Sequence, residues 1–251
     1  MTPIVFIPGI GADAHMVDPV VARLEPAFEC IGWDLPGYGS TPLREPYGFA
    51  DLARWLADDL DALGHDTAFV LGHSIGGMAA LEFAHSFPER LEGLILSGTT
   101  PAFGSRDGSF AAKFLADRLG PLDAGGTMAE LARAAPAELL GSRAGADAAR
   151  KVEALLAEVP EVAYRQAISC LVTFDRRDAL SRIRTPTLLI AGEEDRNAPL
   201  RTMERMVTSM PRAGIEVLRG VGHMAPLEAP ETFAQAVRYF IEETRKPGGR
   251  K

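Results

Sequence analysis

The sequence has few of the features that mark secreted, metal-binding or membrane proteins. Its two cysteines, Cys30 and Cys170, each lie in an apolar stretch, so we expect free thiols rather than a disulfide framework or a metal site. No apolar run approaches the roughly 20 residues that span a bilayer. The first run, residues 4–7, is too short for a signal peptide and has no basic residues before it. These absences predict a cytoplasmic protein with no membrane partner.

Positive charge is also scarce. There are 26 lysines and arginines against 34 aspartates and glutamates, a formal net charge of −8. An acidic protein repels phosphate backbones, so we expect no nucleic acid partner. A content of 47% hydrophobic and 24% charged residues is ordinary for a globular protein, and 251 residues suffice for one large core. The sequence does not set the oligomeric state, and a homodimer is left open.

Short apolar runs alternate along the chain with longer segments of helical periodicity. Most of the runs are apolar throughout rather than alternating, which is typical of strands covered on both faces. They occupy residues 4–7, 30–33, 68–71, 94–96, 187–190 and 215–218. Helical spacing appears between them over 49–63, 78–87 and 231–244. The alternation predicts an α/β fold, with a mostly parallel sheet of about six strands and helices on both faces.

The interval after residue 100 breaks this alternation. It carries helical patterns over 109–119, 128–135, 146–157 and 161–173, and no convincing strand. We predict a core formed by residues 1–100 and 168–251, with residues 101–167 inserted as a helical cap.

A cap above the sheet would supply the substrate pocket. We expect Phe103, Phe114 and Met128 to contact the substrate, which favours a small or medium-sized, mainly apolar molecule. Some arginines are candidates for binding a substrate carboxylate, with solvated side chains as the simpler interpretation; they are Arg133, Arg143, Arg165 and Arg176.

The segment Gly72-His73-Ser74-Ile75-Gly76 carries the most chemical information. It matches G-x-S-x-G and lies between an apolar strand and an apolar helix, the context in which a nucleophilic serine occupies a sharp turn. Backbone strain is expected at Ser74, and the two glycines would remove side chains that collide with the neighbouring elements. The alternative is a glycine-rich turn whose serine caps the helix. We predict that Ser74 is a nucleophile.

A serine nucleophile needs a base and a group that orients the base. Among the five histidines, His223 stands out because it follows the last predicted strand, and sites form at the carboxyl edge of a parallel sheet. Asp195 follows the preceding strand in the same way, with Glu193 and Glu194 as weaker candidates. The chain order Ser74, Asp195, His223 is the one described for hydrolases of this type.

At these motifs the chain resembles the α/β-hydrolase superfamily. The matching segments are Ile7-Pro8-Gly9-Ile10-Gly11, Asp34-Leu35-Pro36-Gly37-Tyr38-Gly39-Ser40, and residues 72–77, 192–195 and 222–231. Residues 174–180 and 185–192 also resemble 3-oxoadipate enol-lactonases and related carboxylesterases. Two departures stand out: Pro8-Gly9 replaces the family's His-Gly, and the leading β-hairpin is missing.

The resemblance also implies an oxyanion hole. It places the two backbone N–H donors at Ile75, directly after the nucleophile, and at Ile10 in the first loop. Each such donor contributes on the order of 10²–10³ in rate. An ordinary strand-to-helix turn is the alternative for the glycines beside Ile10.

The leading hypothesis is a serine hydrolase that needs no cofactor and no metal. Ser74 would attack the carbonyl of a small or medium carboxylic ester or lactone while His223 takes its proton, and water would then hydrolyse the acyl-enzyme. The same triad could instead hydrolyse a C–C bond or catalyse perhydrolysis. A hypothesis from another class is a small-molecule receptor that binds without turnover.

Overall fold

The computed structural model describes residues 2–104 and 109–246. At its centre lies a six-stranded sheet in the order β2-β1-β3-β4-β5-β6, and every neighbouring pair of strands is parallel. The strands are β1 (Ile4–Ile7), β2 (Cys30–Gly32), β3 (Ala68–His73), β4 (Leu91–Ser97), β5 (Thr187–Gly192) and β6 (Ala213–Leu218). The predicted parallel sheet of about six strands is confirmed.

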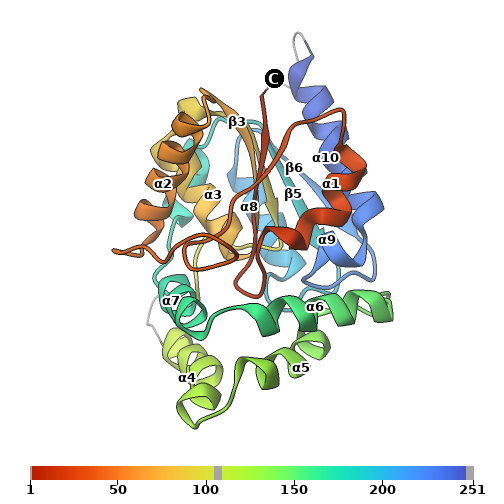
Figure 1. The fold of residues 1–251 in the computed structure, drawn as a ribbon. Coiled ribbons are helices and arrows are strands. Elements are labelled where there is room, and N and C mark those ends of the chain that lie inside the picture. Colours follow the sequence, from red (N-terminus) through yellow and green to blue (C-terminus); the bar gives the residue numbers. More distant parts are fainter. Residues whose placement is uncertain (1, 105–108, 247–251) are drawn as a thin grey trace.

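Helices cover both faces of this sheet (Figure 1). On one face α2 (Phe49–Ala62) and α3 (Ile75–Ser86) pack together, while α1 (Asp18–Leu24) packs on α10 (Pro230–Arg245) on the other. Helix α8 (Leu200–Ser209) lies along β5 and β6, and α9 (Ala225–Glu228) leads into α10. Short 3-10 helices complete the core: η1 (Ala14–Val17), η2 (Pro88–Arg90) and η3 (Arg177–Arg182). Coverage on both faces explains why the central strands β1 and β3 are apolar almost throughout rather than alternating.

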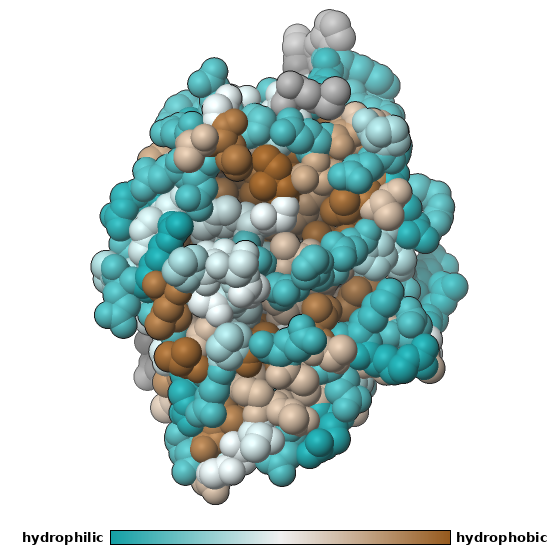
Figure 2. Space-filling model, in the orientation of Figure 1, coloured by the Kyte–Doolittle hydropathy of each residue, from teal (hydrophilic) through white to brown (hydrophobic). Residues whose placement is uncertain are grey.

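The core is deepest in the middle of the sheet. All residues of β1 and β3 are buried, whereas the edge strands β2 and β6 are largely half-exposed. Figure 2 shows a mainly polar surface on this face, with apolar side chains in separate patches. Among the described residues, no helix is both long and apolar enough to cross a membrane.

Four helices lie between β4 and β5: α4 (Ser109–Asp123), α5 (Met128–Leu139), α6 (Ala146–Glu158) and α7 (Glu161–Leu171). They gather at one end of the molecule, in the lower part of Figure 1. The predicted boundary between cap and core, after residue 167, falls inside α7, and the division of the chain into core and cap stays a prediction.

The structure adds three α-helices that the sequence did not predict: α1, α8 and the four-residue α9. Helix α1 has only seven residues and carries Pro19 in its first turn. Helix α8 has a polar composition, and two methionines, Met203 and Met206, form its buried face. Strands β4 and β6 also begin earlier than predicted, at Leu91 and Ala213.

Candidate active site

Ser74 lies on a sharp turn between β3 and α3. Its φ of 56° and ψ of −120° make it the one non-glycine residue with positive φ in the described ranges, so its backbone is strained. A Cβ on Gly72 would lie 2.1 Å from the carbonyl oxygen of Gly76, and one on Gly76 would lie 2.2 Å from that of Ile7. The turn therefore requires glycine at both positions, for the packing reason that the sequence suggested.

His223 and Asp195 meet behind this turn. Nδ1 of His223 lies 2.8 Å from Oδ2 of Asp195, and both residues are buried. The second carboxylate oxygen, Oδ1, accepts hydrogen bonds from the backbone N–H groups of Asn197 and Ala198 at 2.8 and 2.9 Å. Asp195 is thus fixed by its own loop and directs one ring nitrogen of His223, leaving Nε2 for the cavity side.

The ionisation of Asp195 follows from these contacts. Burial alone would raise the pKa of this carboxyl, but the charge and hydrogen bond of His223 and the two backbone N–H groups outweigh burial, and the pKa falls below its usual value. Asp195 is therefore a carboxylate at neutral pH. The weaker candidates lie elsewhere: Glu193 accepts from the N–H of Gly220, and Glu194 binds Ser142.

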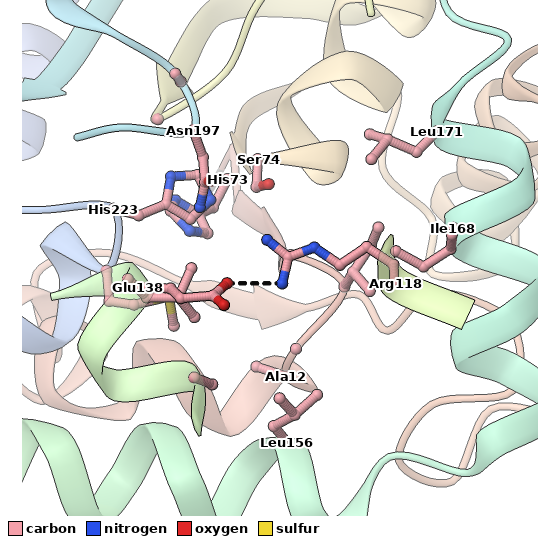
Figure 3. Close-up of a pocket in the computed structure, with 18 of the residues that line it drawn as sticks. Ala12, His73, Ser74, Arg118, Glu138, Leu156, Ile168, Leu171, Asn197 and His223 are labelled. Carbon is pink, nitrogen blue, oxygen red and sulfur yellow. Dashed lines mark hydrogen bonds and ion pairs between the residues drawn. The ribbon is translucent and has the colours of Figure 1, made fainter. Parts of the chain in front are cut away.

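Ser74 and His223 line the same cavity, which has a volume of about 580 Å³ (Figure 3). Its floor comes from loops at the carboxyl ends of the strands, and its roof comes from α4 to α7. Oγ of Ser74 makes no hydrogen bond to any described residue, so the hydroxyl is available to a ligand in the cavity. The side chain of His73 lies beside His223, with ring centroids 4.9 Å apart.

His73 itself is fully enclosed. Burial, reinforced by the neighbouring His223, lowers its pKa to about 3. Its Nδ1 lies 3.2 Å from Oγ of Ser97, while Nε2 is buried without a partner among the described residues. A neutral ring therefore packs against the ring of His223 throughout the neutral pH range.

The backbone N–H groups of Ile10 and Ile75 face no acceptor in the described part of the chain. Ile75 opens α3, so its N–H has no partner within the helix, and Ile10 lies in the loop after β1. Ile10 lines the cavity, and a Cβ on the adjacent Gly9 would touch Ser74 at 3.2 Å. The first loop thus passes close to the serine, as two donors for one oxygen require.

The cavity lining includes two of the three predicted pocket residues. Phe103 and Phe114 lie in it, and their rings contact each other at 4.8 Å. Met128 does not: its side chain is buried in the core cluster at the start of α5. The position of an apolar residue within a predicted helix does not reveal whether it faces the cavity or the neighbouring helix.

An ion pair inside the cavity was missed by the sequence reading. Arg118 of α4 donates to Glu138 of α5 at 2.7 Å, and the guanidinium packs over Phe114, with its central carbon 5.5 Å from the ring (Figure 3). The four arginines proposed as carboxylate ligands are absent from the lining; Arg165 pairs with Asp123 and Glu161 instead. No local motif distinguishes Arg118 from these arginines.

Gly98, in the loop after β4, supports the acid–base pair from behind. It has a φ of +50°, and a Cβ there would lie 3.2 Å from Oδ2 of Asp195 and 3.3 Å from Nδ1 of His223. Its place directly after a buried strand is the signal that could have pointed to it.

Comparison with known proteins finds a family and relatives that match most of the chain. A family model described as "Alpha/beta hydrolase family" matches residues 4–236. The poly(3-hydroxyalkanoate) depolymerase of Ectopseudomonas oleovorans is 30% identical over 260 residues, covering 98% of this chain and 86% of the relative. The pimeloyl-[acyl-carrier protein] methyl ester esterase of Aeromonas salmonicida (strain A449) is 28% identical, covering 95% of this chain and 94% of the relative.

Solved structures share the fold. The enol-lactonase from Burkholderia xenovorans LB400 superposes with a TM-score of 0.85, covering 97% of this chain and 92% of that chain at 22% identity. At this identity the likeness shows the fold alone. In the present chain that fold includes the helices α4 to α7, which lie between β4 and β5 at the carboxyl edge of the sheet.

Proposed function

The chain belongs to the alpha/beta hydrolase family, and we propose that it is a serine hydrolase that cleaves carboxylic esters through an acyl-enzyme. The observation that supports the proposal is the shared cavity, which is lined both by the strained Ser74 and by a histidine whose Nδ1 lies 2.8 Å from a buried carboxylate. Buried acid–base pairs beside an exposed hydroxyl are the arrangement that nucleophilic catalysis requires.

In the first half of the reaction, Oγ of Ser74 attacks the ester carbonyl. Nε2 of His223 takes the hydroxyl proton and then gives it to the leaving alcohol. The carboxylate of Asp195 stabilises the imidazolium that forms between these two transfers. Water then enters, loses a proton to His223 and attacks the acyl carbonyl, and Ser74 recovers its proton as the carboxylic acid leaves.

Negative charge develops on the carbonyl oxygen in both halves. The N–H groups of Ile10 and Ile75 are its donors, and the positive end of α3 points at the same place. Because these donors belong to a rigid turn and a loop held by close contacts, no reorganisation is needed when the charge forms.

The cavity favours an ester with a medium-sized apolar acyl or alcohol part. Aromatic and aliphatic side chains make up most of its lining, and about 580 Å³ accommodates a chain longer than acetate. Two relatives are named for ester substrates, a poly(3-hydroxyalkanoate) and a pimeloyl methyl ester. Arg118 keeps unused N–H donors in this cavity, suited to an oxygen further along the substrate chain. A lactone presents the same carbonyl chemistry in a ring.

The proposal is tested with p-nitrophenyl esters of increasing chain length and a fluorophosphonate probe. We expect wild-type protein to hydrolyse the medium-chain esters and to be labelled at Ser74. Ser74→Ala should lose labelling and about 10⁶-fold in kcat with an unchanged melting temperature. Ser86→Ala, at the far end of the same helix, serves as the matched control. Wild-type turnover in the Ser74→Ala protein would exclude the assignment.

The cytoplasmic location stays a prediction from the sequence. The oligomeric state, for which a homodimer is open, is decided by a sedimentation-velocity measurement.

A further inference from the structure

The carboxylate of Glu228 gathers three backbone N–H groups. Oε1 accepts from Met224 at 3.0 Å, Oε2 accepts from Gly141 at 2.8 Å, and Gly222 donates to both oxygens at 3.1 and 3.0 Å. Gly222 and Met224 are the residues on either side of His223. Gly141 belongs to the connection between α5 and α6 in the inserted helices. One side chain thus holds the loop of the base and the segment that forms the roof of the cavity.

A second contact joins the same two segments. The N–H of His223 donates to the carbonyl oxygen of Leu139 at 2.7 Å. Leu139 is the last residue of α5, and it lines the cavity. The residue that holds the backbone of the base is therefore also part of the substrate pocket.

Glycines allow the backbones to touch at this point. A Cβ on Gly222 would lie 2.4 Å from the nitrogen of Gly141 and 2.5 Å from the oxygen of Leu139. A Cβ on Gly192, at the end of β5, would lie 2.1 Å from the oxygen of Gly222. The loop of the acid, the loop of the base and the inserted segment are stacked without side chains between them.

We propose that Glu228 is a positioning residue that fixes His223 by binding both sides of its loop and by tying that loop to the roof of the cavity. The proposal rests on the proposed function, because it assumes that His223 is the base. Both carboxylate oxygens are needed, since three N–H donors converge on them. A glutamine would turn an N–H of its own toward one of those donors.

Keeping Glu228 ionised costs free energy, and this cost favours a role of Glu228 in positioning the loop of the base. Burial raises the pKa of this carboxyl although three N–H groups act against the rise. Glu228 is half-buried, so its charge costs desolvation free energy, while its four hydrogen bonds fix the geometry of the loop around His223. The coupling has a consequence for substrates: a ligand that displaces α5 also displaces His223, so a poor fit lowers kcat rather than raising KM alone.

The test compares Glu228→Gln with Glu194→Gln. Glu194 provides the matched control because its exposed carboxylate binds the next residue of the same connection, Ser142, at 2.7 and 2.6 Å. Its hydrogen bond to the base loop comes from its backbone N–H, which donates to Val221 and is kept in Glu194→Gln. We expect Glu228→Gln to lose on the order of 10²-fold in kcat, with KM changed less than threefold. Glu194→Gln should keep kcat within twofold.

A readout independent of turnover separates this inference from the proposed function. Hydrogen exchange of the Gly141, Gly222 and Met224 amides should be slow in wild type and at least about tenfold faster in Glu228→Gln. If the wild type neither hydrolyses esters nor reacts with fluorophosphonate, the proposed function fails while the exchange result still tests the clamp. Equal kcat and equal exchange in Glu228→Gln and Glu194→Gln would overturn the inference.

A folding defect is handled by a third variant. Glu228→Asp keeps the charge and both acceptors on a shorter side chain. If Glu228→Gln does not fold, a folded Glu228→Asp with lowered kcat and fast exchange at Gly141 supports the clamp. Wild-type kcat and exchange in Glu228→Asp would overturn it.

Discussion

The cavity has two walls that are built in different ways. The wall beneath it consists of loops at the strand ends, where glycines let backbones touch and where Asp195, His223 and Glu228 are held by hydrogen bonds of 2.7–3.1 Å. The wall above it consists of helices that present mainly apolar side chains inward, together with the pair of Arg118 and Glu138, and that pair other charges at the surface, as Lys151 does with Asp147. Backbones are in direct contact in the lower wall, whereas side chains pack between helices in the upper wall.

This difference assigns separate tasks to the two walls. The lower wall must place a proton acceptor within a fraction of an ångström, since small displacements cost large factors in rate. Apart from Leu139 and Gly141, which bind the loop of the base, the upper wall has to enclose a substrate chain, a task that tolerates substitution. Substitutions in the lower wall should therefore alter kcat, and substitutions in the upper wall should alter substrate preference and stability. The predictions that follow test this division.

Gly98→Ala should produce the largest effect. Its Cβ would press on Asp195 and His223 from 3.2–3.3 Å, at a φ of +50°. We expect a loss on the order of 10²-fold in kcat/KM for a medium-chain ester. Gly125→Ala is the control: this glycine also has positive φ, at +89°, but a Cβ there meets nothing within 4 Å. Equal losses in both variants would mean that backbone strain, not crowding of the site, is responsible.

Leu156→Ala removes side-chain volume from the upper wall and enlarges the cavity. Leu156 is buried and lines the cavity, so its truncation should cost about 2–5 kcal/mol of stability and move the preferred acyl chain to greater length. Urea unfolding and a chain-length series of p-nitrophenyl esters measure the two effects. Leu155→Ala, next to it but outside the lining, should lower stability and leave the chain-length optimum in place. A common shift in both variants would contradict the assignment of the wall.

His73 makes the lower wall sensitive to acid. Its pKa is about 3 in the folded protein, lowered from the ordinary 6.5. Between pH 6.5 and pH 3, His73 is therefore protonated in the unfolded chain and neutral in the folded protein. The contribution of His73 to stability is complete above about pH 6.5 and is lost as the pH falls toward 3. His73→Gln should therefore show a weaker decline of the unfolding free energy between pH 7 and pH 5 than wild type. Parallel declines would show that His73 takes up its proton in the folded state.

Arg118→Met should have the smallest effect. The pair with Glu138 is partly exposed, at 33% and 52% for the two side chains, so its loss should change stability by less than about 1 kcal/mol. We expect kcat/KM for an ester with a second oxygen along its chain to fall about fivefold relative to a plain alkyl ester, measured as a ratio within each variant. Arg165→Met removes a comparable pair outside the cavity and should leave that ratio unchanged.

The sequence predicted the sheet well because its strands are covered on both faces. Buried runs such as residues 4–7 and 68–71 have no polar residue to obscure them, and the first of them coincides with β1. Helix α8 was missed because methionines in a polar sequence form its buried face. The candidate triad could be predicted because its members lie in loops that directly follow strands. In a parallel sheet these loops all lie at the carboxyl edge.

Contacts between distant segments were beyond the reach of sequence patterns. Glu228 lies within the motif that carries the resemblance, yet nothing local shows that its carboxylate reaches Gly141, 87 positions away. The same holds for Arg118 and Met128, since both lie on helices whose rotation relative to the cavity depends on how α4 and α5 pack. Periodicity gives the faces of a helix and leaves open what each face meets.

The place of the inserted helices has a consequence for engineering. Strands β4 and β5 pair directly, from Leu94 with Thr187 to Ser97 with Ile190, although the helices separate them in the chain. The two strands thus set their own register, and we expect the segment between them to be exchangeable as a cassette. A donor cassette would have to bring one backbone carbonyl for His223, one backbone amide for Glu228, and partners for Glu194 and the carbonyl oxygen of Gly220, which now bind Ser142 and Arg143.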